Sequence, residues 1–295
     1  MSRQRWLRRW LESSSAGVRI RARFVAGSTL DEAIAVCRLL QSEGILATLD
    51  HLGENVHTEH DADLSLTAAL QALDRLEKEA LPTTISIKLT QFGLDLDPGL
   101  CQTRIDTLAK TAAAADRKVE VDMESSRYTA RTLDLVAAMH ARHGNFRAVI
   151  QAYLRRSGDD VEKLNRLGIP VRLCKGAYLE GPSVAFSSKP DVDANYRRLM
   201  RLLLIDGSHP AIATHDEVMI KEALEIAANH NRQPDQFEFQ MLYGVRRQLQ
   251  RQIVKGNHQL RVYVPYGEAW YPYFMRRLAE RPANLWFAIR QMVSG

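Results

Sequence analysis

The chain lacks long apolar segments and the short signatures of several common site types. No run of about 18 apolar residues occurs among its 295 residues, which argues against a membrane-spanning helix. The three cysteines are widely scattered and form no CxxC pair, which argues against a disulfide framework or a zinc site and favours a cytoplasmic location. Neither GxGxxG nor GxxxxGK(S/T) appears, so a Rossmann or P-loop nucleotide cradle has no support.

The composition is that of a globular protein, with 45% hydrophobic and 25% charged residues. A net charge of +5 is modest and does not indicate nucleic acid as a partner. Residues 1–23 are different, because they carry seven arginines against Glu12, with tryptophan and leucine at helical spacing. We therefore expect a basic helical segment over 1–23 ahead of one domain over 24–295. Packing on that domain, contact with a membrane surface and a targeting role all remain open for this segment.

Short β-type runs alternate with helical stretches along the remaining chain. The helical stretches include 66–80, 103–115 and 218–230, and Thr29 to Glu32 matches a capping box. The eight β-type runs are 45–49, 84–89, 118–123, 147–153, 170–175, 211–215, 237–241 and 260–264. Eight such units in this length predict an α/β fold of the (β/α)8 TIM-barrel type, with an open doubly wound sheet as the second choice.

Polar or charged side chains stand at the end of every predicted strand. They are Asp50 and His51, Lys88, Asp122, Gln151, Arg172 with Lys175, Thr214 with His215, Gln240, and Tyr263. A single such residue is ordinarily a solvated rim position or part of a structural ion pair. Because barrel enzymes build their sites at the carboxyl ends of the strands, the recurrence predicts a shared polar pocket there.

Several chemistries compete for that pocket. A metal site would draw on His51, Glu54, His57 and His60, but all four come from one segment, and we expect no metal. Lys88 is a candidate Schiff-base lysine of a barrel aldolase. A non-enzymatic, RNA-binding role would rest on the surface arginines. The turn at 175–178, KGAY, would let an anionic cofactor with a heteroaromatic ring approach the backbone closely.

Longer motifs then narrow the choice. They are FVAGSTLDEAI (24–34), LDHLGE (49–54), SIKLTQFGL (86–94), VDMESS (121–126), VIQAYLRR (149–156), RLCKGAY (172–178), ATH (213–215), FQMLYG (239–244) and YVPYGEAWYPYFMRRLAERPAN (263–284). In this order they resemble the motifs of the flavin-dependent proline dehydrogenases across nearly the whole chain. The pattern RRLxERPxN after YxPYG is the most specific of them.

The resemblance implies a distorted (β/α)8 barrel that binds FAD and oxidises L-proline to 1-pyrroline-5-carboxylate. It gives Asp122 and Arg172 catalytic positions in the pocket, with Arg172 near flavin N5. The residues implied to bind substrate are Lys88, Leu242, Tyr263, Tyr273, Arg276, Arg277 and Glu280. Those implied to bind FAD are Met123, Gln151, Arg172, Lys175, Gly176, Ala177, Thr214, His215 and Gln240.

The two adjacent arginines suit the substrate physically. A guanidinium offers a planar fork of donors that fixes both the position and the charge of a carboxylate, which Arg276 and Arg277 would do for proline. The alternative is an ordinary helical salt bridge, because Glu280 lies four residues after Arg276 and three after Arg277. Both arrangements are compatible if Glu280 orients one of the two guanidinium groups.

The resemblance also implies partners. Electrons would pass from the flavin to a membrane quinone, and the product would pass to a separate pyrroline-5-carboxylate dehydrogenase. The chain is expected to be monofunctional, because no aldehyde dehydrogenase sequence follows Gly295. The basic segment 1–23 is a candidate for peripheral contact with the inner face of the membrane.

Overall fold

Eight parallel strands close into a barrel in the computed structural model, which describes residues 21–53 and 56–280, with side chains as far as Met275. Each strand pairs with its neighbour in sequence, and β8 pairs with β1. The strands are β1 (Leu46–His51), β2 (Thr84–Ile87), β3 (Val119–Val121), β4 (Phe146–Gln151), β5 (Val171–Cys174), β6 (Ala211–Ala213), β7 (Glu238–Leu242) and β8 (Leu260–Tyr266). The predicted barrel and its eight strands are confirmed. The second choice, an open doubly wound sheet, was wrong.

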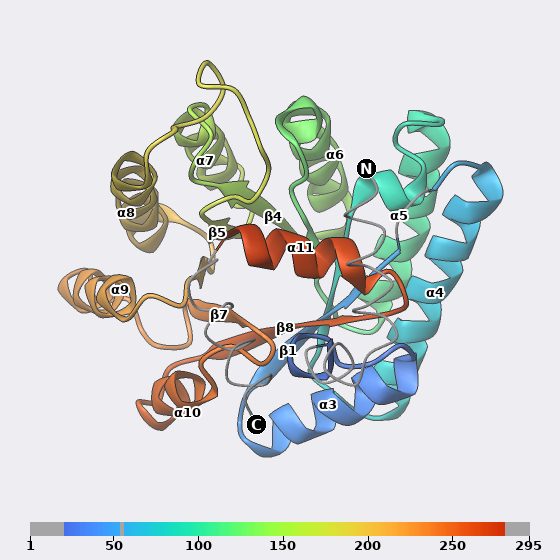
Figure 1. The fold of residues 1–295 in the computed structure, drawn as a ribbon, viewed down its shortest axis with the longest axis horizontal. Coiled ribbons are helices and arrows are strands. Elements are labelled where there is room, and N and C mark those ends of the chain that lie inside the picture. The colour runs from blue at the N-terminus through green and yellow to red at the C-terminus, as the bar shows by residue number, and fades with distance from the viewer. Residues whose placement is uncertain (1–20, 54–55, 281–295) are drawn as a thin grey trace, which may run out of the picture.

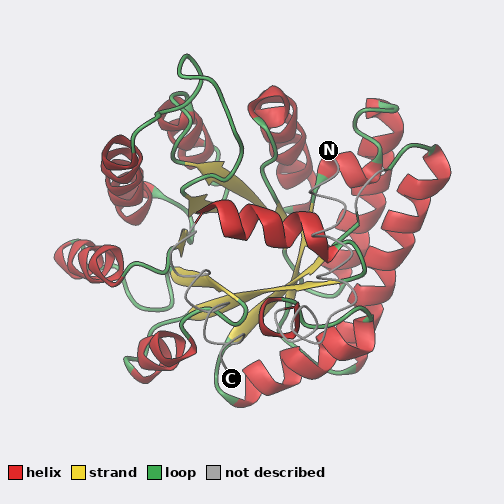
Figure 2. Cartoon of the chain, viewed as in Figure 1, coloured by secondary structure: helices red, strands yellow, loops and turns green. Residues whose placement is uncertain are grey.

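Helices surround the barrel and run back between successive strands (Figures 1 and 2). They are α3 (Leu30–Ser42), α4 (Glu59–Lys78), α5 (Pro98–Ala114), α6 (Ser126–His143), α7 (Ser157–Arg166), α8 (Lys189–Asp206), α9 (Glu217–Asn229), α10 (Arg247–Lys255) and α11 (Trp270–Glu280), with a 3-10 turn, η1, over Leu89–Phe92. The predicted capping box is present, because Thr29 Oγ1 accepts from Glu32 N–H and the Glu32 carboxylate accepts from Thr29 N–H. Residues 1–20 of the expected basic segment lie outside the described residues.

Helix α11 differs from the others in its place. It follows β8 directly and lies across the opening of the barrel, as Figure 1 shows in red. Its buried residues Trp270, Tyr273 and Phe274 form a small apolar cluster with Phe24 and Val25, and Tyr263 of β8 packs against that cluster. Helix α11 thereby covers the carboxyl side of the barrel, where barrel enzymes place their sites.

The outer faces of the strands are apolar and pack against the helices, as in other parallel barrels. The interior is different, because four strands carry buried charged side chains into it. Glu120, Arg147, Glu238 and Arg261 are all less than a tenth exposed. Arg147 Nη1 donates to Glu238 Oε1 at 2.5 Å, and Arg261 Nε donates to the same oxygen at 3.0 Å. From the sequence we singled out only the polar residues at the strand ends and did not predict these charges.

His209 joins this ionic interior just ahead of β6. Its Nδ1 lies 3.2 Å from Arg147 Nη2, and because a guanidinium only donates, Nδ1 must accept and the ring must be neutral. Burial lowers the pKa of His209, and the charge of Arg147 adds to this effect. Glu238 acts in the opposite direction but does not reverse it.

We expect acid to destabilise the protein partly through His209. A histidine whose folded pKa lies below its unfolded value of about 6.5 contributes stability above that pH and loses it as the pH falls. His209→Asn keeps an acceptor and should therefore weaken the pH dependence of the free energy of unfolding between about pH 8 and about pH 5.5. Urea titrations of both proteins at the two pH values measure this, and equal pH dependence in the two would contradict it.

Candidate active site

Four predicted site residues from four strands meet at the carboxyl end of the barrel. Asp122 follows β3, and its carboxylate lies at the centre of the group. Its Oδ1 accepts from Arg172 Nη1 at 2.6 Å, and its Oδ2 accepts from the Tyr263 hydroxyl at 2.6 Å. Lys88, which follows β2, places Nζ 3.5 Å from Asp122 Oδ2. The network therefore joins Lys88 and Asp122, just after β2 and β3, with Arg172 on β5 and Tyr263 on β8.

The charges in this network fix the protonation states. Burial disfavours ionisation of Asp122, but Lys88 and Arg172 outweigh it and hold the pKa of the carboxyl group below its usual value. Burial and the neighbouring Asp122 raise the pKa of Tyr263 well above its usual range. The site thus presents an ionised carboxylate and a neutral phenol that donates to it.

Lys88 lies between two carboxylates. Its Nζ is 2.8 Å from Asp50 Oδ1, on β1, in addition to its contact with Asp122. The Asp50 side chain is fully buried, and that of Lys88 is 15% exposed. Lys88 is thus held in two ion pairs, whereas a Schiff-base lysine must present a free amine to its substrate. This geometry argues against a Schiff-base role for Lys88.

Arg172 connects the site to the charged interior of the barrel. Its Nη2 donates to Glu120, opposite the bond from Nη1 to Asp122. Burial alone would lower the pKa of Arg172, but Glu120 and Asp122 raise it. Arg172 Cζ also lies 5.3 Å from the centroid of the Tyr263 ring, within cation–π range. The guanidinium is therefore held on three sides.

Glu120 lies beneath the network and accepts a hydrogen bond from Arg172. Burial opposes its ionisation, but the guanidinium groups of Arg172, Arg147 and Arg261 outweigh burial and lower the pKa of Glu120 to about 2. Thr84 Oγ1 donates to its Oε1 at 2.8 Å. Gln240 Nε2 donates to Glu120 at 3.2 Å and to Glu238 at 2.7 Å. The structure thus places the amide nitrogen of Gln240 on the two interior carboxylates.

The other predicted cofactor residues follow β3 to β6, on one side of the barrel opening. Gln151 Nε2 donates to Glu124 O at 2.9 Å, just after the buried Met123. Lys175 Nζ pairs with Asp193 at 2.5 Å. His215 Nε2 accepts from Leu242 N–H at 2.9 Å, so the proton of the neutral imidazole is on Nδ1.

The turn after β5 is shaped by Gly176. Its φ is +110°, and a Cβ there would lie 2.1 Å from Cδ1 of the Tyr153 ring, so no other residue fits without displacing that ring. Ala177 follows, and Thr214 stands at the end of the adjacent strand with its hydroxyl accepting from Asp216 N–H at 3.1 Å. Ammonium, imidazole, hydroxyl and carboxamide groups around a backbone kept small by glycine are suited to a phosphate-bearing flavin.

The predicted substrate residues of α11 fall into two groups. Tyr273 is 5% exposed and belongs to the apolar cluster against which Tyr263 packs. Arg276, Arg277 and Glu280 lie on the last turns of the same helix, and their side chains lie outside the described residues. Leu242, at the end of β7, is partly buried.

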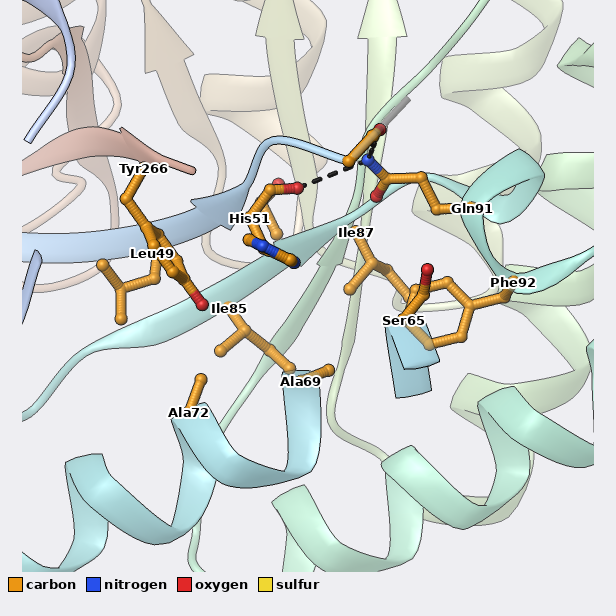
Figure 3. A pocket seen from close by; sticks show the side chains of 12 residues that line it. Leu49, His51, Ser65, Ala69, Ala72, Ile85, Ile87, Gln91, Phe92 and Tyr266 are labelled. Atoms are coloured by element: carbon orange, nitrogen blue, oxygen red, sulfur yellow. Dashed lines mark hydrogen bonds between the residues drawn. The ribbon is translucent and has the colours of Figure 1, made fainter. Parts of the chain in front are cut away.

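His51 does not join the network, although it is adjacent to Asp50. Strand alternation turns it outward, where its ring packs 5.0 Å from that of Tyr266. It lines a small cavity between β1, β2 and α4, beside Ala69 and Ala72 (Figure 3). The cavity volume of about 30 Å³ admits water but no cofactor.

The suggested metal cluster of His51, Glu54, His57 and His60 gains no support from the structure. Glu54 lies outside the described residues. Within 21–53 and 56–275, no three histidine, cysteine or acidic side chains gather as metal ligands. Thr58 caps α4 through Asp61 N–H, so this stretch serves as a helix start.

Three residues of the site were not assigned a role from sequence. Asp50 stood among the strand ends but received none. Ser86 hydroxyl donates to Asp122 Oδ1 at 2.9 Å, and Glu124 accepts from Thr90 Oγ1 at 2.6 Å. For Ser86 the signal was the alternation along β2, which directs it to the same side as Lys88, two residues later.

Comparisons with known proteins agree on one family. The sequence profile of the family described as Proline dehydrogenase matches residues 33–290. Proline dehydrogenase 2 of Bacillus subtilis (strain 168) is 39% identical over 285 residues, which cover 97% of this chain and 92% of that protein. Proline dehydrogenase of Deinococcus radiodurans is 36% identical over 280 residues, covering 92% and 90%.

A solved structure is also similar. Proline utilization A (PutA) of Bdellovibrio bacteriovorus, inactivated by N-propargylglycine, superposes with a TM-score of 0.84 at 26% identity. The match covers 91% of this chain and 33% of that longer chain. The profile match over most of the sequence, together with two relatives above 30% identity, establishes that this chain belongs to the proline dehydrogenase family.

Proposed function

We propose that this protein oxidises L-proline to 1-pyrroline-5-carboxylate with FAD as its flavin. Its family and the names of its relatives support proline as the substrate. The observation that carries the proposal is the Asp122 carboxylate, which Lys88, Arg172 and Tyr263 surround at the mouth of the barrel. A catalytic domain over 24–295, preceded by a basic segment over 1–23, is the domain organisation that we propose.

Proline must lose a hydride from the ring carbon that is next to nitrogen and does not carry the carboxylate, while its amine is neutral. When bound, FAD supplies the two-electron acceptor for this hydride. Asp122 remains ionised, so its carboxylate would accept a hydrogen bond from the neutral amine N–H and orient it. Arg172 is a permanent positive charge, and it would stabilise the negative charge that develops on the cofactor side of the pocket.

The substrate would lie between the network and α11. Arg276 and Arg277 would hold its carboxylate, with Glu280 orienting one guanidinium and Lys88 adding a positive charge from the barrel. The aromatic rings of Tyr263 and Tyr273, with Leu242, would pack against the apolar part of the proline ring.

FAD would occupy the β3 to β6 side of the opening. The residues that we propose to hold it are Met123, Gln151, Arg172, Lys175, Gly176, Ala177, Thr214 and His215. Gln240 would act through Glu120, which it contacts, and so through Arg172. The donors of this set match the phosphate and ribityl oxygens of such a cofactor.

We further propose a membrane quinone as electron acceptor and a separate pyrroline-5-carboxylate dehydrogenase as the next enzyme. A peripheral position on the inner face of the membrane, aided by residues 1–23, would bring the flavin close to that quinone. None of the helices within the described ranges has the length and apolar character to cross a bilayer.

The spectrum of the purified protein tests the cofactor assignment. We expect a flavin absorption band, and heat treatment should release FAD, identified by chromatography against FAD and FMN standards. Release of FMN, or a colourless protein after incubation with excess FAD, would contradict the proposal.

Borohydride reduction tests the aldolase alternative, in which Lys88 forms a Schiff base. We expect borohydride to trap no substrate on Lys88.

Arg276→Met tests the carboxylate assignment. Loss of a charge-assisted donor should weaken L-proline binding by about 1.5–3 kcal/mol, or roughly 10- to 150-fold in Kd. The dependence of flavin reduction on proline concentration measures this Kd. Arg251→Met, which breaks the exposed 2.8 Å pair with Glu43 on the barrel wall, should leave it unchanged. Equal Kd values for Arg276→Met and the unaltered protein would exclude the assignment.

A further inference from the structure

A long loop connects β5 to α8 and carries part of the proposed FAD site. We call residues 175–188 the strap, which Figure 1 shows as the yellow loop near α7. It begins with Lys175, Gly176 and Ala177. Any constraint on the path of the strap is therefore also a constraint on these three residues.

Both ends of the strap are fixed to the segment after β4. At its start, Lys175 O accepts from Tyr153 N–H at 2.8 Å. Near its end, Ala185 forms an antiparallel bridge with Leu154, and Phe186 N–H donates to Tyr153 O at 2.8 Å. Tyr178 packs against the small cluster that contains Tyr153 and Ala185.

The tip of the strap has little apolar burial. Leu179 is fully exposed, and residues 181–184 are exposed as well. Glu180, between them, is partly buried and points to another element. The tip must therefore be held by polar contacts rather than by packing.

Glu180 uses both carboxylate oxygens on the start of α6. Ser126 N–H donates to Oε1 at 2.7 Å, and Ser126 Oγ donates to Oε2 at 2.7 Å. The N-cap residue, Ser125, makes no side-chain capping bond of its own. Glu180 therefore supplies the acceptor and the negative charge that a helix N-terminus requires.

This contact joins the two sides of the proposed cofactor site. Helix α6 begins soon after Asp122 and Met123, on the β3 side, whereas the strap leaves β5. We propose that Glu180 is a positioning residue, which holds the strap against α6 and thereby slows the release of FAD. This inference rests on the proposed role of Lys175, Gly176 and Ala177 in FAD binding.

FAD release from the holoenzyme tests the proposal. FAD regains fluorescence when it leaves the protein, so dilution of purified holoenzyme gives the dissociation rate. Glu180→Ala should raise this rate about 10-fold, the effect expected from losing hydrogen bonds to a charged group. Glu180→Gln keeps one acceptor oxygen and should recover part of the loss. In Glu180→Ala, the added change Ser126→Ala should have little further effect, because its hydroxyl no longer has Glu180 as a partner.

Asp134→Asn is the matched control. Asp134 also lies on α6 and pairs with Lys163 of α7 at 3.1 Å, away from the strap, so this variant should release FAD at the unaltered rate. An unchanged rate in Glu180→Ala, or an equal rise in Asp134→Asn, would overturn the proposal. Lys175→Met distinguishes a wrong FAD site from a wrong role for Glu180. An unchanged rate of FAD release in Lys175→Met would mean that the proposed FAD site is wrong. A faster release in Lys175→Met but not in Glu180→Ala would reject only the role of Glu180.

Discussion

Arg147→Met is expected to lower the free energy of unfolding by about 3–5 kcal/mol, because it leaves buried carboxylates without one of their cations. Arg147 is 1% exposed and lies 2.5 Å from Glu238 and 3.5 Å from Glu120. Both carboxylate side chains are fully buried, so protein groups rather than bulk water must compensate their charges. Urea denaturation at neutral pH measures the loss.

Two variants make this prediction specific. Arg197→Met removes an exposed cation that pairs with Glu222 at 2.9 Å and should cost no more than about 1 kcal/mol. Adding Glu238→Gln to Arg147→Met removes one of the carboxylates that lost a cation, so the double variant should be more stable than the sum of the single effects predicts. Equal losses for Arg147→Met and Arg197→Met would mean that the barrel interior is hydrated and that its ion pairs contribute little.

Arg172→Met is expected to slow the reduction of the flavin by L-proline about 10²- to 10³-fold, the range seen when a preorganised electrostatic donor is lost. The guanidinium bridges Glu120 and Asp122, so its removal also frees Asp122 to change position. Rapid mixing under anaerobic conditions measures the rate, and absorbance gives the FAD occupancy. We expect the slower rate in the FAD-bound fraction, whether or not the occupancy also falls.

Lys163→Met provides the control, because Lys163 is half-exposed and pairs only with a surface carboxylate among the described residues, Asp134. L-Proline should bleach the flavin of this variant at the unaltered rate. Full FAD occupancy with an unaltered rate in Arg172→Met would remove Arg172 from the catalytic site and leave it a structural role in the barrel.

The fold was predictable because each strand is a short run of apolar and β-branched residues followed by a polar residue and a helical pattern. The charged interior of the barrel was not predictable from such patterns. Glu120, Arg147, Glu238 and Arg261 each stand singly between apolar residues, and only the closure of the barrel brings them together. Buried charges of this kind are tolerable only with partners, and the partners lie on strands far apart in sequence.

The site was predictable to a similar extent. Strand ends pointed to Lys88, Asp122, Arg172 and Tyr263, which the structure brings into one network. Sequence position could not separate Asp50 from His51, because only the register of β1 decides which of them faces the barrel interior. The placement of α11 over the opening likewise depends on the short connection after β8.

Anaerobic addition of L-proline to the purified, FAD-loaded protein tests the central claim most directly. If the network holds the amine of proline opposite the flavin, as we propose, the flavin absorption band should bleach with L-proline and persist with D-proline. A band that L-proline leaves unchanged, at full FAD occupancy and with the protein folded, would contradict the account.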